Sequence, residues 1–342
     1  MITVGIPRSL LYYQYYPMCK VFFEELGAKV TVSEPTSKGV VTAGSARVVA
    51  ETCLPVKVFC GHVMALTGKC DMVFVPAVRS LGANAYNCSK FLGLPDLVKG
   101  VVRDCPPILD IDIDVNKGRR LLYENIYRLG RPFTWNPLRV KRAAEKAWQT
   151  HLAYEEKMRR EALTPLQAIE AVCQGKPRGE SDSDMEAAAT IAVVGHPYVI
   201  YDEYINHRLI SKLRSWKIKV LTPEMVSGED LDRAIASFIG KPYWTYEDEV
   251  TGAGGYFLKQ QVDGVLGVVP FGCGPDSVMI DILQRYAKRE QARPFMPLTI
   301  DDHTAEAGLV TRLEAFVDMI LRRKRHATCA SSPSVTMPAE TV

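Results

Sequence analysis

Three cysteines of this sequence stand where chains commonly build a reactive or metal-binding site. Cys273 lies between Gly272 and Gly274, after an apolar run and just before a proline suited to the first turn of a helix. Cys53 also precedes a Leu-Pro pair, and Cys88 ends a loop that follows a short apolar strand. A thiolate is favoured at a helix N-terminus, and glycines allow a large group to approach the backbone. The alternative for each cysteine alone is a buried structural thiol.

The spacing of the cysteines limits the kind of site they can form. The chain holds nine cysteines, an odd and scattered set with no C-x-x-C pair. This pattern argues against a zinc ribbon, a thioredoxin site and a local ferredoxin motif, and it differs from a secreted disulfide scaffold. Any metal site must therefore be assembled from distant residues. Three thiolates suit soft metals and iron–sulfur clusters, and zinc is the alternative metal.

The other six cysteines stand in less favourable positions. Cys60 lies one or two helical turns beyond Cys53, which makes it an alternate ligand. Cys105 precedes a double proline and a strand, from which it could line the same cleft, and Cys70 falls in a predicted turn. Three more are excluded as ligands because they lie inside a core helix or near a linker or tail: Cys19, Cys173 and Cys329.

Four polar residues are candidates for catalysis because they follow predicted strands or accompany a candidate cysteine. His62 lies on the helix that follows Cys53, and His196 follows the first strand of the second half. His303 and Glu306 follow the last strand. For each of them, helix capping or an ordinary buried hydrogen bond is the alternative role.

Alternating strands and helices must position these residues. Each half of the chain contains short apolar runs separated by helical patterns, which indicates parallel, doubly wound sheets. In the first half the predicted strands cover residues 2–6, 29–33, 72–76 and 107–113, and in the second half 190–194, 219–221, 262–269 and 297–300. The segment 77–87 is predicted to be a loop, and a helix is predicted from about 38 to 50.

The two halves also match in their landmarks, which predicts an internal duplication. In each half a strand ends at a proline, Pro76 or Pro270, and a cysteine follows, Cys88 or Cys273. Ligands of open α/β sheets bind outside the carboxyl ends of strands, so these cysteines can converge in a cleft. We therefore expect a first domain over residues 1–131, a helical connector and linker over 132–187, a second domain over 188–326 and a disordered tail over 327–342.

Composition excludes several classes of partner. The chain has 342 residues, of which 47% are hydrophobic and 24% charged, as in an ordinary globular protein. A net charge of +3 is too small to indicate nucleic acid or an anionic membrane as partner. We find no apolar run that could cross a bilayer and no signal peptide, so a cytoplasmic location is expected.

Several segments together carry a family resemblance: Gly5–Arg8, Glu51–Lys57 with Gly61 and His62, Cys88 with Phe91–Asp96, Gly195–Tyr198, Phe271–Ser277 and Asp301–Gly308. In combination they resemble the acyl-CoA dehydratase activase-related family (DUF2229). That family is related to the cluster-bearing subunits of 2-hydroxyacyl-CoA dehydratases and benzoyl-CoA reductases, and to double-cubane cluster proteins. The resemblance implies two flavodoxin-like (Rossmann-type) domains and a helical part.

The resemblance also implies a cofactor and a partner. It implies an iron–sulfur cluster, most simply [4Fe–4S], held by Cys53, Cys88 and Cys273, with Gly272 and Gly274 beside it. A double cubane would need about six thiolates and would have to recruit Cys60, Cys70 or Cys105. A separate ATP-hydrolysing activator would deliver electrons, since this chain lacks a phosphate-binding loop.

The hypothesis is thus an oxygen-sensitive redox protein that acts on a small low-potential substrate, such as an acyl-CoA, in a homo- or heterodimer. Two other functions stay open at this point. The chain could be a non-enzymatic electron-transfer or scaffold subunit of such a system. It could also be a binding module that has kept the fold without a cluster.

Overall fold

The computed structural model describes residues 1–82, 84–174, 187–290 and 293–331, and its first half forms a parallel sheet. The four strands are ordered β2-β1-β3-β5, which is the flavodoxin-like order of the first four strands. Their bounds are β1 (Thr3–Ile6), β2 (Lys29–Val32), β3 (Met72–Phe74) and β5 (Ile108–Leu109).

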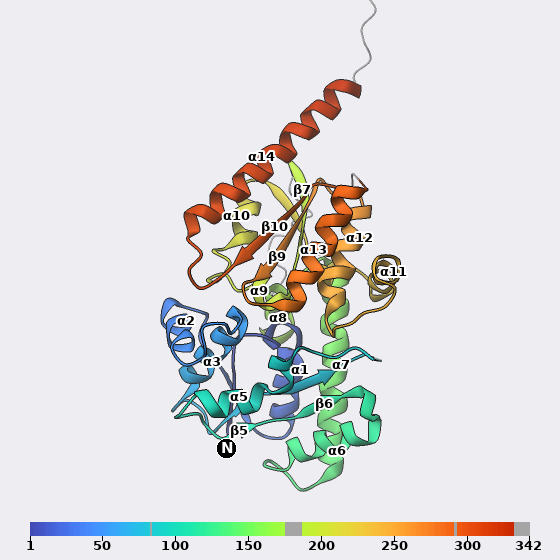
Figure 1. Cartoon of the computed structure of the whole chain (residues 1–342). Coiled ribbons are helices and arrows are strands. Elements are labelled where there is room, and N and C mark those ends of the chain that lie inside the picture. The colour runs from blue at the N-terminus through green and yellow to red at the C-terminus, as the bar shows by residue number, and fades with distance from the viewer. Residues whose placement is uncertain (83, 175–186, 291–292, 332–342) are drawn as a thin grey trace, which may run out of the picture.

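The second half repeats this arrangement. Its parallel sheet has the order β8-β7-β9-β10, so each strand occupies the place of its counterpart in the first sheet (Figure 1). The strands are β7 (Ala189–Val194), β8 (Ile218–Leu221), β9 (Gly264–Pro270) and β10 (Phe295–Ile300). All seven residues of β9 are buried, as expected for a parallel strand that helices cover on both faces. The predicted pair of duplicated parallel-sheet domains is confirmed.

A small second sheet in the first half differs from the prediction. Residues 77–87 do not form a continuous loop, because β4 (Ala77–Ser80) pairs in parallel with β6 (Asp112–Asp114). The strand predicted over 107–113 is therefore divided between two sheets. Pro76, which lacks a backbone donor, stands between β3 and β4 and separates the two ladders.

The helices of the first half cover its sheet and position Cys53. Ser37 caps α2, which ends at Ser45 rather than near residue 50. A Cβ placed on Gly44 would lie 1.8 Å from the Lys57 carbonyl oxygen, so glycine is required for α2 to pack this closely on α3. The helices are α1 (Tyr12–Glu25), α2 (Lys38–Ser45), α3 (Leu54–Leu66), α4 (Ser89–Leu92), α5 (Leu94–Val101) and α6 (Arg119–Gly130).

The predicted helical connector is present. It consists of α7 (Pro137–Glu161), whose N-terminus is capped by Asn136, and α8 (Pro165–Gln174). Figure 1 shows α7 lying along α1. The Tyr154 hydroxyl donates to the Tyr13 carbonyl oxygen at 2.6 Å, which joins the two helices in the core. Residues 175–186 of the predicted linker lie outside the described residues.

The helices of the second half complete the repeat, with one correction at the C-terminus. The last helix continues to Ser331, past the predicted start of a disordered tail at 327, and residues 332–342 lie outside the described residues. The helices are α9 (Pro197–Ile200), α10 (Leu209–Ser215), α11 (Gly228–Phe238), a π-helix (Asp248–Gly252), α12 (Ala253–Lys259), α13 (Gly274–Arg289) and α14 (Glu306–Ser331).

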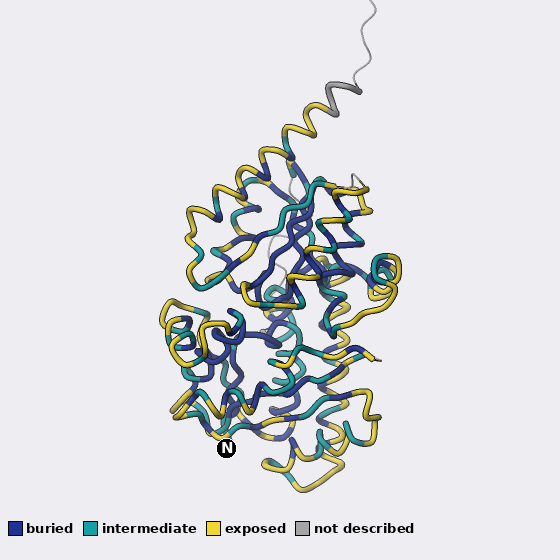
Figure 2. The backbone as a smooth tube through the Cα atoms, viewed as in Figure 1, coloured by how far each residue is buried: buried dark blue, intermediate teal, exposed yellow. Residues whose placement is uncertain are grey.

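The two halves share one hydrophobic core. It includes Val4 and Val73 of the first sheet together with Ile191 and Leu266 of the second. Figure 2 shows buried segments running through both halves, whereas α14 is largely exposed. Among the described residues, no helix is both long and apolar enough to span a membrane.

Candidate functional site

Each of the three candidate cysteines stands at the start of a helix. Cys53 precedes α3, Cys88 precedes α4 and Cys273 precedes α13, each as the N-cap residue in extended conformation. No side chain caps any of these three helices. The first amide groups of a helix carry partial positive charge, so all three positions favour an anionic sulfur ligand. We call Cys53, Cys88 and Cys273 the junction cysteines.

The backbones that carry Cys53 and Cys273 are in contact. The Leu54 amide donates to the Phe271 carbonyl oxygen at 3.5 Å, and a Cβ on Gly272 would lie 3.3 Å from the Cys53 Cα. Gly272 has a φ of +80°, in the left-handed region that favours glycine. The segment that follows β9 in the second half is therefore in direct contact with the start of α3 in the first half.

The thiols themselves are neighbours as well. Burial raises the pKa of Cys53 to about 11, and the nearby Cys88 and Asp276 raise it further against the effect of the α3 amides. Burial also raises the pKa of Cys273, with contributions from Asp276 and Cys53. Cys53 thus lies within electrostatic range of both other junction cysteines. In this state the two thiols are protonated at neutral pH, and a metal would displace their protons.

The described residues contain no ready-made site for a single metal ion. Within the described residues, no three His, Cys, Asp or Glu side chains are grouped closely enough to bind one metal ion. In an iron–sulfur cluster each iron binds its own thiolate, so the cysteines surround a larger object. The three junction cysteines are half-buried free thiols, and the Asp276 carboxylate lies near two of them, Cys53 and Cys273. Gly274 adds space, because a Cβ there would meet nothing within 4 Å.

His196 joins the Cys273 helix to the rest of the junction. This 5% exposed histidine lies between two carboxylates, with Nδ1 2.6 Å from Glu249 and Nε2 2.9 Å from Asp276. Burial alone would lower the pKa of His196, but Asp276 and Glu249 raise it well above its usual value. The ring is therefore a buried imidazolium. Asp276 also hydrogen-bonds with the Cys273 thiol.

Two more residues extend this network across the junction. The Gln14 amide of α1 donates to Glu249 at 2.7 Å, and the Tyr198 ring stacks on His196 at 5.1 Å. The sequence analysis did not identify Glu249. It stands in a π-helix, and no motif marks it, although an acidic residue in a π-bulge is a feature that recurs at functional sites.

His62 has a different environment, although it is equally buried. Its Nδ1 lies 2.9 Å from the Ser33 hydroxyl and its Nε2 lies 2.9 Å from the Thr36 hydroxyl. The Thr36 hydroxyl donates to Asp202 of the second half at 2.5 Å, so it accepts from His62 Nε2–H. Burial lowers the pKa of His62 to about 4. The residue is a neutral structural link between the two halves.

The other two catalytic candidates lie on the surface. His303 is exposed, and Glu306 begins α14 and pairs with Lys212 at 2.7 Å. Asp302, which stands beside them after the last strand, lies at the contact between the two halves. It accepts from the Lys57 ammonium at 3.2 Å and from the Ser45 hydroxyl at 3.0 Å, which makes a further contact between the halves. The four candidates thus have separate partners and do not form one catalytic group.

Cys105 does not line the junction. It precedes β5 and therefore lies at the amino end of the strand, whereas the junction cysteines follow the carboxyl ends. The same holds for Cys70, which precedes β3. Cys60 is fully buried within α3.

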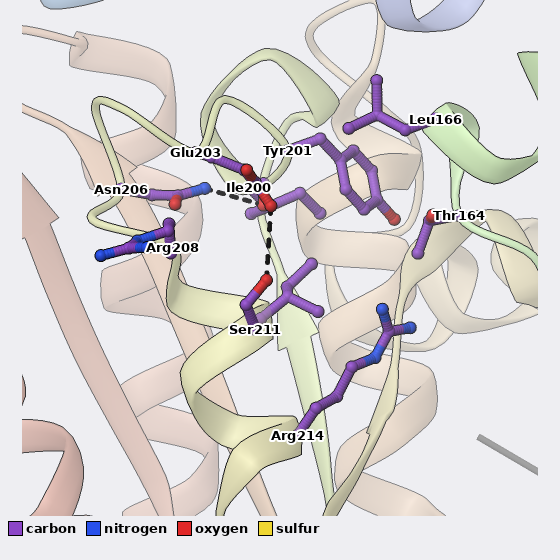
Figure 3. A pocket seen from close by; sticks show the side chains of 10 residues that line it. Thr164, Leu166, Ile200, Tyr201, Glu203, Asn206, Arg208, Ser211 and Arg214 are labelled. Carbon is purple, nitrogen blue, oxygen red and sulfur yellow. Dashed lines mark hydrogen bonds between the residues drawn. The ribbon is translucent and has the colours of Figure 1, made fainter. Parts of the chain in front are cut away.

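A small cavity of about 60 Å³ lies elsewhere, beside α8 and α10. Figure 3 shows its polar lining, which includes Tyr201, Arg208 and Arg214, and the hydrogen bond of 3.3 Å from Ser211 to Glu203. None of the junction cysteines lines it.

Comparison with known families agrees with this architecture. A family model described as CoA enzyme activase uncharacterised domain (DUF2229) matches residues 3–226, which is more than half of the chain. This chain belongs to the DUF2229 family. No curated protein matches it. The DUF2229 match includes Cys53 and Cys88 but ends before Cys273, so the third junction cysteine is assigned from the structure of this chain.

Proposed function

We propose that this DUF2229 protein is an iron–sulfur redox protein of the 2-hydroxyacyl-CoA dehydratase, benzoyl-CoA reductase and double-cubane type. Its cluster would be a [4Fe–4S] cubane bound by Cys53, Cys88 and Cys273. One observation supports the proposal, namely that the three cysteines stand at three helix starts and that the segments of Cys53 and Cys273, from different halves of the chain, are in contact.

The surrounding residues support this function in distinct ways. The starts of the three helices direct amide groups toward the anionic sulfur ligands. Gly272 allows the two ligand-bearing segments to approach each other. The imidazolium of His196 holds Asp276 at the start of α13 and offsets its negative charge. When bound, such a cluster stores low-potential electrons, and its fourth iron is open to an exogenous ligand.

A single cubane is favoured over a double one. Six thiolates would require all three of Cys60, Cys70 and Cys105 in addition to the three junction cysteines. Cys70 follows α3, whereas Cys53 precedes it, and a helix of 13 residues is about 20 Å long. The two groups therefore lie too far apart to bind one compact cofactor.

The proposal includes a partner and a substrate class. A separate ATP-hydrolysing activator would reduce the cluster, and the chain would act in the cytoplasm as a homo- or heterodimer on a small low-potential substrate such as an acyl-CoA. The family description supports a place in a CoA enzyme system.

A second candidate function is a non-enzymatic electron carrier or scaffold of the same system. It rests on the same cysteine positions, which could hold an electron-carrying cluster without a substrate beside it. In that case electrons would pass through the junction without a substrate binding there.

Anaerobic reconstitution with iron and sulfide tests the cluster. We expect the wild-type protein to gain brown charge-transfer absorption, and Cys273→Ser to lose most of the bound iron. Cys70→Ser is the matched control and should retain the iron of the wild type. Colourless wild-type protein, or equal iron in Cys273→Ser and the wild type, would contradict the proposal.

Turnover separates the enzyme from the carrier. The reconstituted protein is incubated anaerobically with an activator ATPase, ATP and an acyl-CoA, and product formation is followed by chromatography. Conversion that depends on all components supports the enzyme. Reduction of the cluster without conversion of any acyl-CoA supports the carrier.

A further inference from the structure

Two cysteines stand at the amino ends of neighbouring strands of the first sheet. In the pairing of β3 with β5, Val73 lies opposite Ile108, and the Val73 amide donates to the Pro107 carbonyl oxygen at 3.0 Å. Cys70 lies two residues before β3 and Cys105 three residues before β5, so both stand just outside this ladder, at the same end of two neighbouring strands. We call Cys70 and Cys105 the edge cysteines.

Their spacing suits a covalent link. Neighbouring strands lie about 4.8 Å apart. Disulfides join residues whose Cα atoms are about 4.4–6.8 Å apart. The electrostatic effect of Cys70 on Cys105, which adds to the effect of burial in raising the pKa of Cys105, places the two thiols near each other.

The surroundings hold the two segments together and leave the thiols accessible. The Thr67 hydroxyl, just after α3, donates to the Asp104 carbonyl oxygen at 3.2 Å, one residue before Cys105. Both edge cysteines are half-buried, whereas Cys60, the third thiol of this region, is fully buried. Solvent thus reaches the edge pair but not Cys60.

We propose that Cys70 and Cys105 form a reversible intramolecular disulfide by exchange with a small-molecule disulfide such as oxidised glutathione. This modification site does not depend on the cluster or on the proposed function. The edge cysteines lie at the amino ends of the strands, whereas the junction cysteines follow the carboxyl ends.

The exchange proceeds in two balanced steps. The thiolate of one edge cysteine attacks a sulfur of the small disulfide, which forms a mixed disulfide and releases one small thiolate. The second edge cysteine, as thiolate, then attacks the mixed disulfide and releases the other small thiolate. In total the protein loses two protons and two electrons, and the small disulfide is reduced to two thiols.

The link would constrain a segment that matters for the junction. It closes residues 70–105 into a loop, and this loop includes β4 and Cys88. The disulfide should therefore restrict the movement of Cys88, which is one of the junction cysteines, without contacting Cys53 or Cys273.

Peptide mapping tests the proposal. The full-length reduced protein is treated with oxidised glutathione under argon, free thiols are alkylated, and the digest is analysed by mass spectrometry. We expect a peptide pair linked through Cys70 and Cys105, with a rate that rises about tenfold per pH unit below the thiol pKa values. Cys70→Ser should lose this pair and carry glutathione on Cys105. Cys19→Ser, whose thiol lies in α1, should keep the pair.

Two outcomes would overturn the proposal, and both can be read on wild-type protein alone. One is a digest in which Cys60 rather than Cys70 is linked to Cys105, or in which the edge cysteines stay unlinked. The other is protection of the edge cysteines when the protein is reconstituted with iron and sulfide, because they would then be metal ligands. If the protein failed to bind iron, the proposed function would be refuted, but the disulfide between Cys70 and Cys105 would still be expected to form.

Discussion

The two sheets of this protein have the same strand order but different chemistry at their carboxyl ends. The first half provides two of the junction cysteines, Cys53 and Cys88, at the starts of α3 and α4. The second half provides one, Cys273, with the buried pair Asp276 and His196. The duplicated fold thus supplies equivalent positions, and the loops after the strands decide what each half contributes.

The buried histidines show the same contrast. His62 of the first half lies between two hydroxyl groups, and burial keeps it neutral. His196 of the second half lies between two carboxylates, which keep it charged despite burial. The partners rather than the degree of burial therefore determine the charge. A neutral link joins the halves in one place, and a charged network supports Cys273 in the other.

The largest expected effect concerns the two groups of cysteines. In protein reconstituted with iron and sulfide, the three junction cysteines should resist alkylation almost completely, because in the proposed function they are the cluster ligands. The edge cysteines Cys70 and Cys105 should react in the same sample, since they are similarly half-buried but unligated. Mass spectrometry of iodoacetamide-treated protein measures both groups. Equal labelling of the two groups would remove the distinction between them.

The second prediction concerns the neutral histidine. The folded pKa of His62 is about 4, below the ordinary 6.5, so its contribution to stability is present above pH 6.5 and is lost as the pH falls toward 4. The loss should reach about 3 kcal/mol at the acid end of this window. In urea unfolding, His62→Gln should lack this part of the acid dependence. His303→Gln, at an exposed position, should retain the wild-type profile; an unchanged profile in His62→Gln would show that His62 is not neutral.

The third prediction concerns the ion pair between the halves. Lys57→Ala leaves Asp302 in a position where only 13% of its side chain is exposed, with Ser45 as its remaining partner. The free energy of unfolding should fall by about 2 kcal/mol. Lys20→Ala, which removes an exposed pair within α1, should cost less than about 0.5 kcal/mol. Equal effects in urea unfolding would mean that the Lys57–Asp302 pair does not stabilise the contact.

The smallest effect separates the two glycines around Cys273. Gly272→Ala must adopt a φ of +80° and brings a Cβ to 3.3 Å from Cys53, so it should destabilise the protein by about 1 kcal/mol and weaken iron retention. Gly274→Ala meets no atom within 4 Å and should be close to neutral for the stability of the cluster-free protein. Thermal unfolding measures both. Similar losses in the two variants would contradict the assigned contact.

Much of the fold could be predicted because its signals are local. Buried parallel strands appear as continuous apolar runs, and the repeated proline and cysteine after a strand indicated the duplication. The division of residues 107–113 between two sheets was missed, since it depends on pairing with β4, far away in the sequence. The helix end at Ser331 was also missed, because the Ser- and Pro-rich composition further on suggested an earlier stop.

The site was only partly predictable for a related reason. The positions of Cys53, Cys88 and Cys273 at helix starts follow from local sequence. The partners of the buried charges do not, because Glu249 reaches His196 from a π-helix and Asp302 reaches Lys57 from the other half of the chain. Cys105 was predicted to line the cleft, but it precedes β5 and lies at the amino end of that strand. The sequence pattern gave its position next to a strand but not which end of the strand faces the junction.

The most direct test of the cluster is an EPR spectrum of reconstituted, dithionite-reduced wild-type protein, together with its iron and sulfide content. The account predicts roughly four irons and four sulfides per chain and the signal of a reduced [4Fe–4S] cluster. A protein that binds no iron, or that binds a single ion without sulfide, would contradict it.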